Sequence, residues 1–368
     1  MIITRTPFRI SFFGGGTDYP VWYRERPGAV LATTINKYCH ISCRFLPPFF
    51  DYTSRIVWSK IEHVNDPSQI QHPAVRAALQ FLRISRGISL HHEGDLPARS
   101  GMGSSSAFTV GLLHALSGLQ GALSSKERLA RDAMHVEQRL LRENVGSQDQ
   151  VLTAYGGFNR ISFSGEDCLR VEPVLLPQQR LLELRRHLLL CFTGLSRTAS
   201  EIAAEQIKKT SDKTAELQSM YGMVDEALRI LSGRDDLLAF GRLLHESWVL
   251  KRGLTEHIST PYLDELYDAA CRAGAIGGKL LGAGGGGFFL LFARPEHHQK
   301  IKERLRKVLH IPFEFEHGGS QVIFYEPENP AEGLQELSSN AAASEGRIDA
   351  AVPGQPASPE RSLAGVSS

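Results

Sequence analysis

The stretch Leu96-Pro97-Ala98-Arg99-Ser100-Gly101-Met102-Gly103-Ser104-Ser105-Ser106-Ala107 is the most informative part of this 368-residue chain. It leads into a segment, residues 104–119, that is apolar nearly all round and therefore predicts a buried helix. Glycines let the backbone approach a ligand closely, and the start of a helix attracts anions. The serine hydroxyls could reach phosphate oxygens or Mg²⁺. This serine–glycine loop (residues 96–106) predicts a phosphate site, with a plain serine-rich helix start as the alternative.

Two common nucleotide-binding motifs are excluded for this loop. No Gly-Lys-Ser/Thr follows it, so it is not a Walker P-loop. The glycine spacing is also wrong for a dinucleotide fingerprint, and no acidic residue closes a second strand about 20 residues further on.

A second glycine-rich segment lies near the N-terminus, at Pro7-Phe8-Arg9-Ile10-Ser11-Phe12-Phe13-Gly14-Gly15-Gly16-Thr17-Asp18-Tyr19-Pro20. It predicts a strand that ends in a turn, here called the N-terminal glycine turn (residues 14–18). The turn presents Thr17 and Asp18, and a carboxylate beside glycines can accept hydrogen bonds from sugar hydroxyls. Arg9 is a cation on the strand. A hairpin turn with a solvated Asp18 is the alternative.

A third segment is Lys279-Leu280-Leu281-Gly282-Ala283-Gly284-Gly285-Gly286-Gly287-Phe288. Five glycines in six positions cost much chain entropy on folding, so they indicate a close backbone approach. The alternative is a flexible linker. Residues 282–287 are called the C-terminal glycine loop below.

Carboxylates follow the serine–glycine loop along the chain. Ser124 and Glu127 form a capping-box pattern that opens a predicted helix over residues 124–142. Glu137 lies at the margin of the buried face of this helix, and Glu143 is a second candidate. Asp149 is the carboxylate of a glycine-led loop, residues 144–150. Phosphoryl transfer needs metal neutralisation, positioning and often a base, which such a pair of acids could provide.

Composition limits the remaining possibilities. Apolar residues make up 42% of the chain and the formal net charge is +1, so a normal core is expected and neither nucleic acid nor an anionic membrane is indicated as partner. The apolar runs are too short to span a bilayer, and the first 20 residues do not resemble a signal peptide. Five scattered cysteines indicate reduced thiols in a cytoplasm.

The chain is expected to form two αβ halves, residues 1–177 and 178–327. Past residue 327 large apolar residues nearly vanish, which predicts a disordered tail over residues 328–368.

The three segments together resemble, in the same order along the chain, the motifs of the GHMP kinase superfamily, named for galactokinase, homoserine kinase, mevalonate kinase and phosphomevalonate kinase. The resemblance covers residues 2–325. It implies an α+β fold with an N-terminal ribosomal-protein-S5-like domain and a C-terminal ferredoxin-like domain. It also implies ATP and Mg²⁺ as cofactors and a small-molecule substrate. A homodimer is left open.

The resemblance assigns a role to each motif residue. Asp149 would be the catalytic base, or would only orient the acceptor hydroxyl, and Arg9 would lie near the transferred phosphoryl group. Ser105 and Glu137 would hold Mg²⁺. The residues implied in ATP binding are Pro97, Gly101, Met102, Gly103, Ser104, Ser105 and Ser106. Those implied in substrate binding are Thr17, Asp18, Arg197, Gly284 and Gly285.

Within the superfamily, the segments at 6–20, 146–150 and 279–287 are most similar to the D-glycero-D-manno-heptose 7-phosphate kinase branch. Galactokinases normally read Gly-Glu-His-Thr-Asp in the first motif, and Glu-His is absent here. The new phosphate would go to the anomeric oxygen, giving a 1,7-bisphosphate. Cations for the phosphate already on the acceptor would be Arg197, Lys251, Arg252 or Lys279. The alternatives are a fucokinase- or galactokinase-like enzyme, a catalytically silent sugar or ATP sensor, and a nucleotide-sugar or dinucleotide-binding enzyme.

Overall fold

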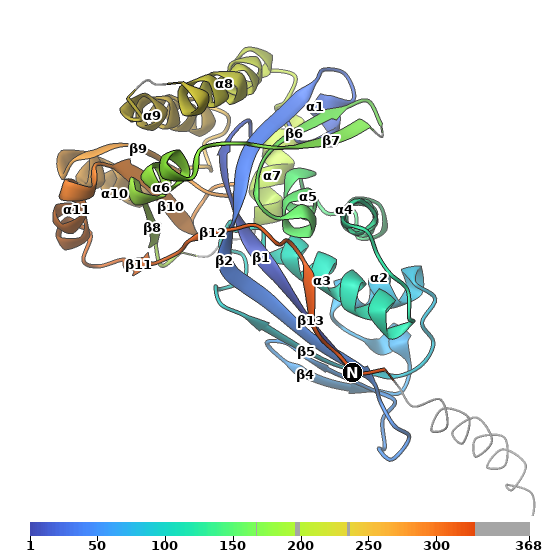
Figure 1. Ribbon diagram of the computed structural model, residues 1–368. Helices are drawn as coiled ribbons and strands as arrows, with labels where there is room; N and C mark the ends of the chain where they lie inside the picture. The colour runs from blue at the N-terminus through green and yellow to red at the C-terminus, as the bar shows by residue number, and fades with distance from the viewer. Residues whose placement is uncertain (167, 196–198, 234–235, 328–368) are drawn as a thin grey trace, which may run out of the picture. The chain divides into compact units, whose positions relative to one another are not determined.

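Two long antiparallel strands, β1 (Ile2–Phe13) and β2 (Gly28–Phe45), form the centre of the first sheet (Figure 1). The sequence predicts two shorter strands in place of each, over residues 2–4 and 8–13 for β1 and over residues 30–35 and 39–45 for β2. The register of the pair shifts between Pro7 and Phe8, which is where the expected break lies. An irregularity of this kind bends a strand without ending it, so each pair of predicted strands is one continuous strand.

The computed structural model describes residues 1–327 except 167, 196–198 and 234–235. Within it, residues Met1–Glu326 form one unit with two β-sheets. The disorder predicted for residues 328–368 lies outside the described residues. In the part of the chain that is described, no helix has both the length and the apolar character needed to cross a membrane.

The first sheet has nine strands, and its main path runs β13-β1-β2-β5-β3-β4. All strand pairs are antiparallel except β3 with β5. The remaining strands of the sheet are β3 (Ser54–Val57), β4 (Ile61–Val64), β5 (Ile88–Gly94), β6 (Phe158–Ser164), β7 (Cys168–Pro173), β12 (Phe315–Glu316) and β13 (Gln321–Tyr325).

Helix α3 (Ser104–Leu119) packs against β1 and β2, and its bounds are those that the sequence predicts (Figure 1). The helix predicted over residues 124–142 begins later, with Ser125 and not Ser124 as its cap, because the Ser125 hydroxyl accepts from the Arg128 amide. After α4 (Lys126–Met134) the chain continues as a π-helical segment, η2 (His135–Leu140). The other helices on this side are α1 (Pro20–Tyr23), η1 (Pro67–Gln69), α2 (Pro73–Phe81) and α5 (Gln148–Tyr155).

The second sheet is antiparallel, in the order β11-β8-β10-β9. Its strands are β8 (Leu188–Phe192), β9 (Ala275–Leu280), β10 (Phe288–Ala293) and β11 (Leu309–Ile311). The accompanying helices are α6 (Gln178–Arg186), α7 (Ala199–Lys208), α8 (Thr214–Ser232), α9 (Leu238–Arg252), α10 (Pro261–Arg272), η3 (Pro295–His297) and α11 (His298–Arg304). The chain then returns to the first sheet as β12 and β13, which lie after residue 177 in the sequence. The division of the chain into two halves at residue 177 stays a prediction.

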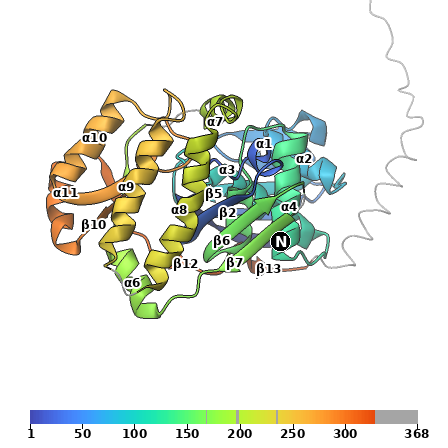
Figure 2. The ribbon, with the colours of Figure 1, turned by 90° about the horizontal axis from the view of Figure 1, so that it is seen from above.

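Helices α8 and α9 lie side by side (Figures 1 and 2), and α8 contacts β1 and β2 of the first sheet while α9 contacts β9 and β10 of the second. Aromatic rings join α9 to both sheets. Phe240 of α9 lies 5.5 Å from Phe12 and 5.1 Å from Phe13, between ring centroids, and 6.0 Å from Phe292 of β10. Edge-to-face contacts of buried rings stabilise such a junction. The end of β1, where the N-terminal glycine turn begins, is therefore fixed against the second sheet.

Candidate active site

The serine–glycine loop ends at Gly103, which caps α3 with a left-handed backbone (φ 74°). Hydrogen bonds inside the loop shape it, from the Ser100 hydroxyl to the Pro97 carbonyl (2.6 Å) and from the Arg99 amide to the Ser104 hydroxyl (3.3 Å). The helix ladder starts only with the Ala107 amide, which donates to the Gly103 carbonyl. The amides of residues 104–106 precede it, and amides at this position are available to an anion.

The serine–glycine loop and the C-terminal glycine loop touch backbone to backbone. A Cβ on Gly101 would overlap the Leu281 carbonyl oxygen, and one on Gly287 would overlap the Ser100 carbonyl. The close approach that the glycine count predicts is therefore made between these two loops. Gly284 and Gly285 are buried, and the Gly285 amide donates to the Ile258 carbonyl at 2.9 Å. Their predicted role toward a substrate remains a prediction.

Arg9 and Asp149 form a bidentate ion pair. Arg9 Nε donates to Asp149 Oδ1 and Arg9 Nη2 donates to Asp149 Oδ2, each at 2.6 Å. The third guanidinium nitrogen, Nη1, donates to the Gly101 carbonyl at 2.6 Å, and the Arg9 amide donates to the Met102 carbonyl. Asp149 lies in the first turn of α5 and not in the predicted loop. The pair thus joins β1, α5 and the serine–glycine loop, in the geometry in which guanidinium binds carboxylate most strongly.

Asp18 faces the same region from the N-terminal glycine turn. Its carboxylate accepts from the Gly16 amide (2.9 Å) and the Gln148 amide (3.4 Å). A Cβ on Gly146 would overlap the Asp18 carboxylate, so a larger residue there would displace that side chain. Burial, and then the nearby charge of Asp149, raise the pKa of Asp18, against the amide hydrogen bonds that lower it.

Thr17, predicted to bind substrate, is fully buried. Its hydroxyl is used within the chain, on the Gly14 carbonyl (2.8 Å) and on Ala29. The structure therefore shows Thr17 shaping the turn that presents Asp18.

Glu137 lies on the π-helical segment and is fully buried. The hydroxyl next to it is that of Ser106, which donates to Glu137 Oε2 at 2.9 Å, while Gln150 Nε2 donates to the same oxygen. Ser105, expected beside Glu137, is exposed. Successive side chains point about 100° apart around a helix, so only one of the three adjacent serines can face Glu137, and that serine is Ser106. Burial raises the pKa of Glu137 to about 7.

The surroundings of Glu137 fit a divalent cation. Its Oε1 atom is buried without a hydrogen-bond partner among the described residues. The nearby Thr109 hydroxyl donates to the Ser105 carbonyl, and its closeness to Glu137 opposes the rise of the Glu137 pKa. An unpartnered buried carboxylate oxygen with a raised pKa is stabilised by a nearby positive charge. The described residues hold no group of three or more Asp, Glu, His or Cys that could bind a metal. Mg²⁺ commonly uses one carboxylate, water and substrate phosphates, which suits this single acid.

An aromatic cluster near the serine–glycine loop was not anticipated from the sequence. Phe108 of α3 stacks on His72 (4.6 Å between ring centroids) and meets His92 edge-on (4.9 Å), and Trp58 packs edge-on against His72 (4.8 Å). Three of the four rings are partly exposed. The rings come from four separate stretches of chain, so no local spacing could have revealed them.

The four cations proposed to bind the phosphate on the acceptor differ in their contacts. Arg197 lies outside the described residues. Arg252 pairs with Asp264 at 2.8 Å. Lys251 and Lys279 are buried and donate to backbone carbonyls. In the described structure, Arg252 and the two lysines are therefore engaged within the chain.

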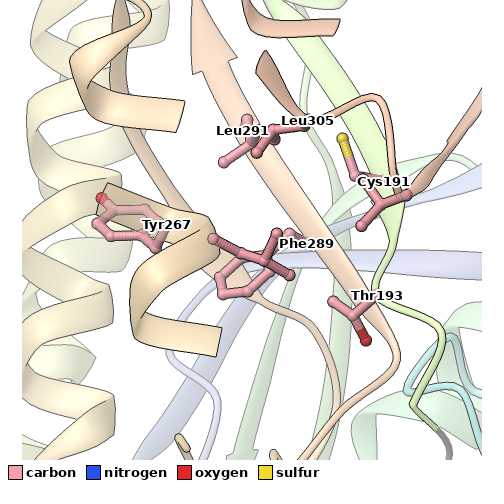
Figure 3. Close-up of a pocket in the computed structure, with 8 residues that line it drawn as sticks. Cys191, Thr193, Tyr267, Phe289, Leu291 and Leu305 are labelled. Atoms are coloured by element: carbon pink, nitrogen blue, oxygen red, sulfur yellow. The ribbon is translucent and has the colours of Figure 1, made fainter. Parts of the chain in front are cut away.

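A separate cavity lies between the second sheet and helix α10 (Figure 3). It is lined by Cys191, Thr193, Leu266, Tyr267, Phe289, Leu291, Leu305 and Val308. Its volume of about 10 Å³ is close to the least that one water needs, so it cannot hold a nucleotide or a sugar.

Comparison with known proteins agrees with this arrangement. Residues 72–157 match the family model described as GHMP kinases N terminal domain, and residues 225–311 match GHMP kinases C terminal. The chain is 28% identical over 317 residues to D-glycero-alpha-D-manno-heptose 7-phosphate kinase of Campylobacter jejuni, covering 83% of this chain and 93% of that protein. It is 31% identical over 251 residues to mevalonate kinase of Pyrococcus horikoshii, covering 65% of this chain and 69% of that protein.

Among solved structures, the fold is similar to that of a D-glycero-D-manno-heptose 1-phosphate kinase from Bacteroides thetaiotaomicron. The TM-score is 0.73 at 22% identity, over 89% of this chain and 100% of the other. The α+β architecture expected from the sequence is confirmed. With both domain models matched and a relative above 30% identity covered over more than two thirds of its length, the chain belongs to the GHMP kinase family and is an ATP-dependent phosphotransferase.

Proposed function

We propose that this kinase transfers the γ-phosphoryl group of ATP to the anomeric hydroxyl of a sugar phosphate, D-glycero-D-manno-heptose 7-phosphate. The observation that carries the proposal is the Arg9–Asp149 pair, which lies where the serine–glycine loop, α5 and the Asp18 turn come together. The similarity to a heptose 7-phosphate kinase over most of both chains supports the choice of acceptor.

The donor side uses the start of α3. The amides of residues 104–106 bind the phosphates, and the nearby aromatic cluster of Trp58, His72, His92 and Phe108 offers a stacking surface for the adenine. Glu137 and the Ser106 hydroxyl would hold Mg²⁺. When bound, this cation would neutralise charge on the phosphate oxygens.

The acceptor side uses the two aspartates. The buried Asp18 accepts hydrogen bonds from sugar hydroxyls and so orients the ring. A carboxylate has about four lone-pair positions that can accept hydrogen bonds, and Arg9 donates to two of those on Asp149. Asp149 can therefore still accept a hydrogen bond from the attacking hydroxyl. Arg9 stabilises the charge on the transferred phosphoryl group. We assign the phosphate already on the acceptor to Arg197.

The reaction is a displacement at the γ-phosphorus. The anomeric oxygen forms the new P–O bond, the bond to the β-phosphate oxygen breaks, and ADP leaves. The hydroxyl proton passes to Asp149 or, if Asp149 only orients the hydroxyl, to solvent. Since the transition state is loose, positioning by Arg9, Asp18 and Asp149 contributes more than the strength of the base.

A panel of acceptors tests this proposal. ADP release is measured with heptose 7-phosphate, fucose, galactose and mannose phosphates, and ³¹P NMR identifies the phosphorylated oxygen. We expect kcat/KM for heptose 7-phosphate to exceed that of the others by at least about tenfold, with a new anomeric phosphate signal. Preference for a sugar without a phosphate would overturn the choice of acceptor. ATP binding without turnover of any sugar would favour a silent sensor.

A further inference from the structure

Two buried lysines take no part in the chemistry proposed above. Lys251 is 7% exposed and Lys279 is 3% exposed. Within the described residues neither forms an ion pair with a carboxylate, and both donate only to main-chain carbonyls. Burying an ammonium group without a counter-ion is costly, so an apolar residue would be more stable in either place. Their contacts indicate what they do instead.

Lys279 connects the two sheets. It lies on β9 in the second sheet, and its Nζ donates to the Phe12 carbonyl of β1 at 2.8 Å. Phe12 is two residues before Gly14, where the N-terminal glycine turn begins. Lys279 therefore holds the base of the turn that presents Asp18.

Lys251 fixes the C-terminal glycine loop. It lies in the last turn of α9, and its Nζ donates to the carbonyls of Leu280 (2.8 Å) and Gly282 (2.6 Å). Leu281, between these two, is the residue whose carbonyl touches Gly101 of the serine–glycine loop. Through Leu281, Lys251 sets the position of the loop that would carry the phosphates.

We infer that Lys251 and Lys279 are positioning residues, which set the separation between the Asp18 turn and the serine–glycine loop and thereby the alignment of acceptor with donor. This inference rests on the proposed function, since it assigns Asp18 to the acceptor and the serine–glycine loop to ATP. The Asp18 turn follows Phe12 along the chain, and the Phe12 carbonyl accepts from Lys279. Leu280, next to Lys279 in sequence, accepts from Lys251, which also binds Gly282 beside Gly101.

The charges around the lysines make this alignment depend on pH. Arg9 and Asp18 act on both groups, Lys279 acts on Lys251, and Asp149 and Tyr19 lie in the same electrostatic network through Asp18. Burial is the main effect on both lysines and Arg9 adds to it, while Asp18 opposes. Together they lower the pKa of Lys279 to about 7 and that of Lys251 well below its ordinary value.

Lys279 titrates near neutral pH, because its pKa is lowered to about 7, and its Nζ donates to a single carbonyl, that of Phe12. Its charged form makes a stronger hydrogen bond to Phe12 than its neutral form. The link to β1 is strong below the pKa of Lys279 and weakens as pH rises through it.

The test is the pH dependence of turnover in Lys279→Met, Lys279→Gln and Lys300→Met, an exposed control on α11. We expect wild-type kcat to decline above about pH 7, in a pH profile that fits the loss of one proton. Lys279→Met should have kcat about 10–100-fold lower, no decline in this range and a nearly unchanged KM for ATP. Lys279→Gln keeps an N–H donor and should recover part of the lost kcat. Its kcat should likewise not decline above about pH 7. Lys300→Met should match wild type.

Melting temperatures measured in parallel separate positioning from simple destabilisation. A structural role alone would lower the melting temperature and kcat while leaving the alkaline decline in place. That outcome, or a Lys279→Met enzyme with the wild-type rate, would overturn the inference. If neither Lys279 variant folds, the wild-type profile decides, because absence of an alkaline decline contradicts the inference. A wild-type protein without turnover would instead contradict the proposed function, and the inference with it.

Discussion

The Asp149 carboxylate is held by Arg9 on two atoms and still has room for the acceptor hydroxyl. Asp149→Asn keeps the shape of the side chain but removes its charge and half of its acceptor capacity. We expect kcat to fall by roughly 10²–10⁴-fold with an ATP dissociation constant within a few-fold of wild type. Steady-state kinetics and ATP titration measure the two quantities.

Asp132→Asn is a matched control for this variant. Asp132 is also paired with an arginine, Arg128, and its side chain has the same 23% exposure as that of Asp149. It lies on α4, away from the contacts of Arg9. We expect it to turn over at the wild-type rate. Equal losses in the two variants would remove Asp149 from the reaction.

Glu137 should destabilise the protein when no metal is bound. Its pKa is raised from 4.5 to about 7 in the fold, so the folded state binds more protons than the unfolded state between these values. The free energy of unfolding therefore falls as pH rises from about 4.5 to about 7, and the full cost remains above pH 7. In EDTA at pH 8, Glu137→Gln should be more stable than wild type by roughly 1–3 kcal/mol, and at pH 4.5 the difference should vanish.

The same variant tests the metal assignment. Mg²⁺ added with ADP should raise the melting temperature of wild type more than that of Glu137→Gln, because a ligand stabilises only the state that binds it. Glu143→Gln is the control, since burial also raises the pKa of Glu143 and no hydrogen bond among the described residues joins its side chain to Ser106 or Gln150. The charge of Glu143 does add to the raised pKa of Glu137, so the comparison is made on Mg²⁺ stabilisation and not on pH dependence. Equal Mg²⁺ stabilisation of Glu137→Gln and wild type would refute the metal role.

Sequence reasoning identified the acids better than their partners. Glu137 stands out because it lies at the margin of the buried face of a predicted helix, and Asp149 because it is the one carboxylate in an otherwise neutral, glycine-led stretch. Which of three adjacent serines meets Glu137 depends on the rotation of α3 against η2, and that rotation is set by packing between distant segments. Gln150 carries no such signal in the sequence, because its contact with Glu137 exists only once α5 lies beside η2.

The contact between the two glycine loops makes a prediction about their backbone. Gly101 and Gly121 both have positive φ, 80° and 72°, but a Cβ would overlap Leu281 only at Gly101 and meets nothing within 4 Å at Gly121. Gly101→Ala should therefore weaken ATP binding at least about tenfold and lower stability by roughly 1–3 kcal/mol. Gly121→Ala carries the backbone strain alone and should keep the wild-type affinity. Calorimetry and thermal unfolding measure both, and equal ATP affinity in both variants would contradict the loop contact.

Elements with a strong local signal were predicted well. Helix α3 has the bounds that its apolar sequence and glycine start indicate. Strand β9 was missed because Ala275–Leu280 contains two glycines and little β-branched character. The π-helical segment was missed because a widened turn leaves no mark in hydrophobic spacing.

The complete molecule brings together motifs that are far apart in the chain. Arg9 meets Asp149 across 140 positions, and Lys279 meets Phe12 across 267. No periodicity predicts such contacts. The order of the motifs and their similarity to a known family predicted that they would meet, while the aromatic contacts of Phe240 and the buried lysines that hold them in place became visible only in the fold.

The most direct measurement of the central claim is phosphoryl transfer followed by ³¹P NMR, in wild type and in Arg9→Met, with ATP, Mg²⁺ and heptose 7-phosphate. Wild type should produce ADP and an anomeric phosphate. Arg9→Met should lose about 10³-fold or more in rate and still bind ATP, because a cation on the transferred group acts mainly in the transition state. Transfer at the wild-type rate by Arg9→Met, or no transfer by wild type, would contradict a phosphoryl-transfer site at the junction of the three glycine segments.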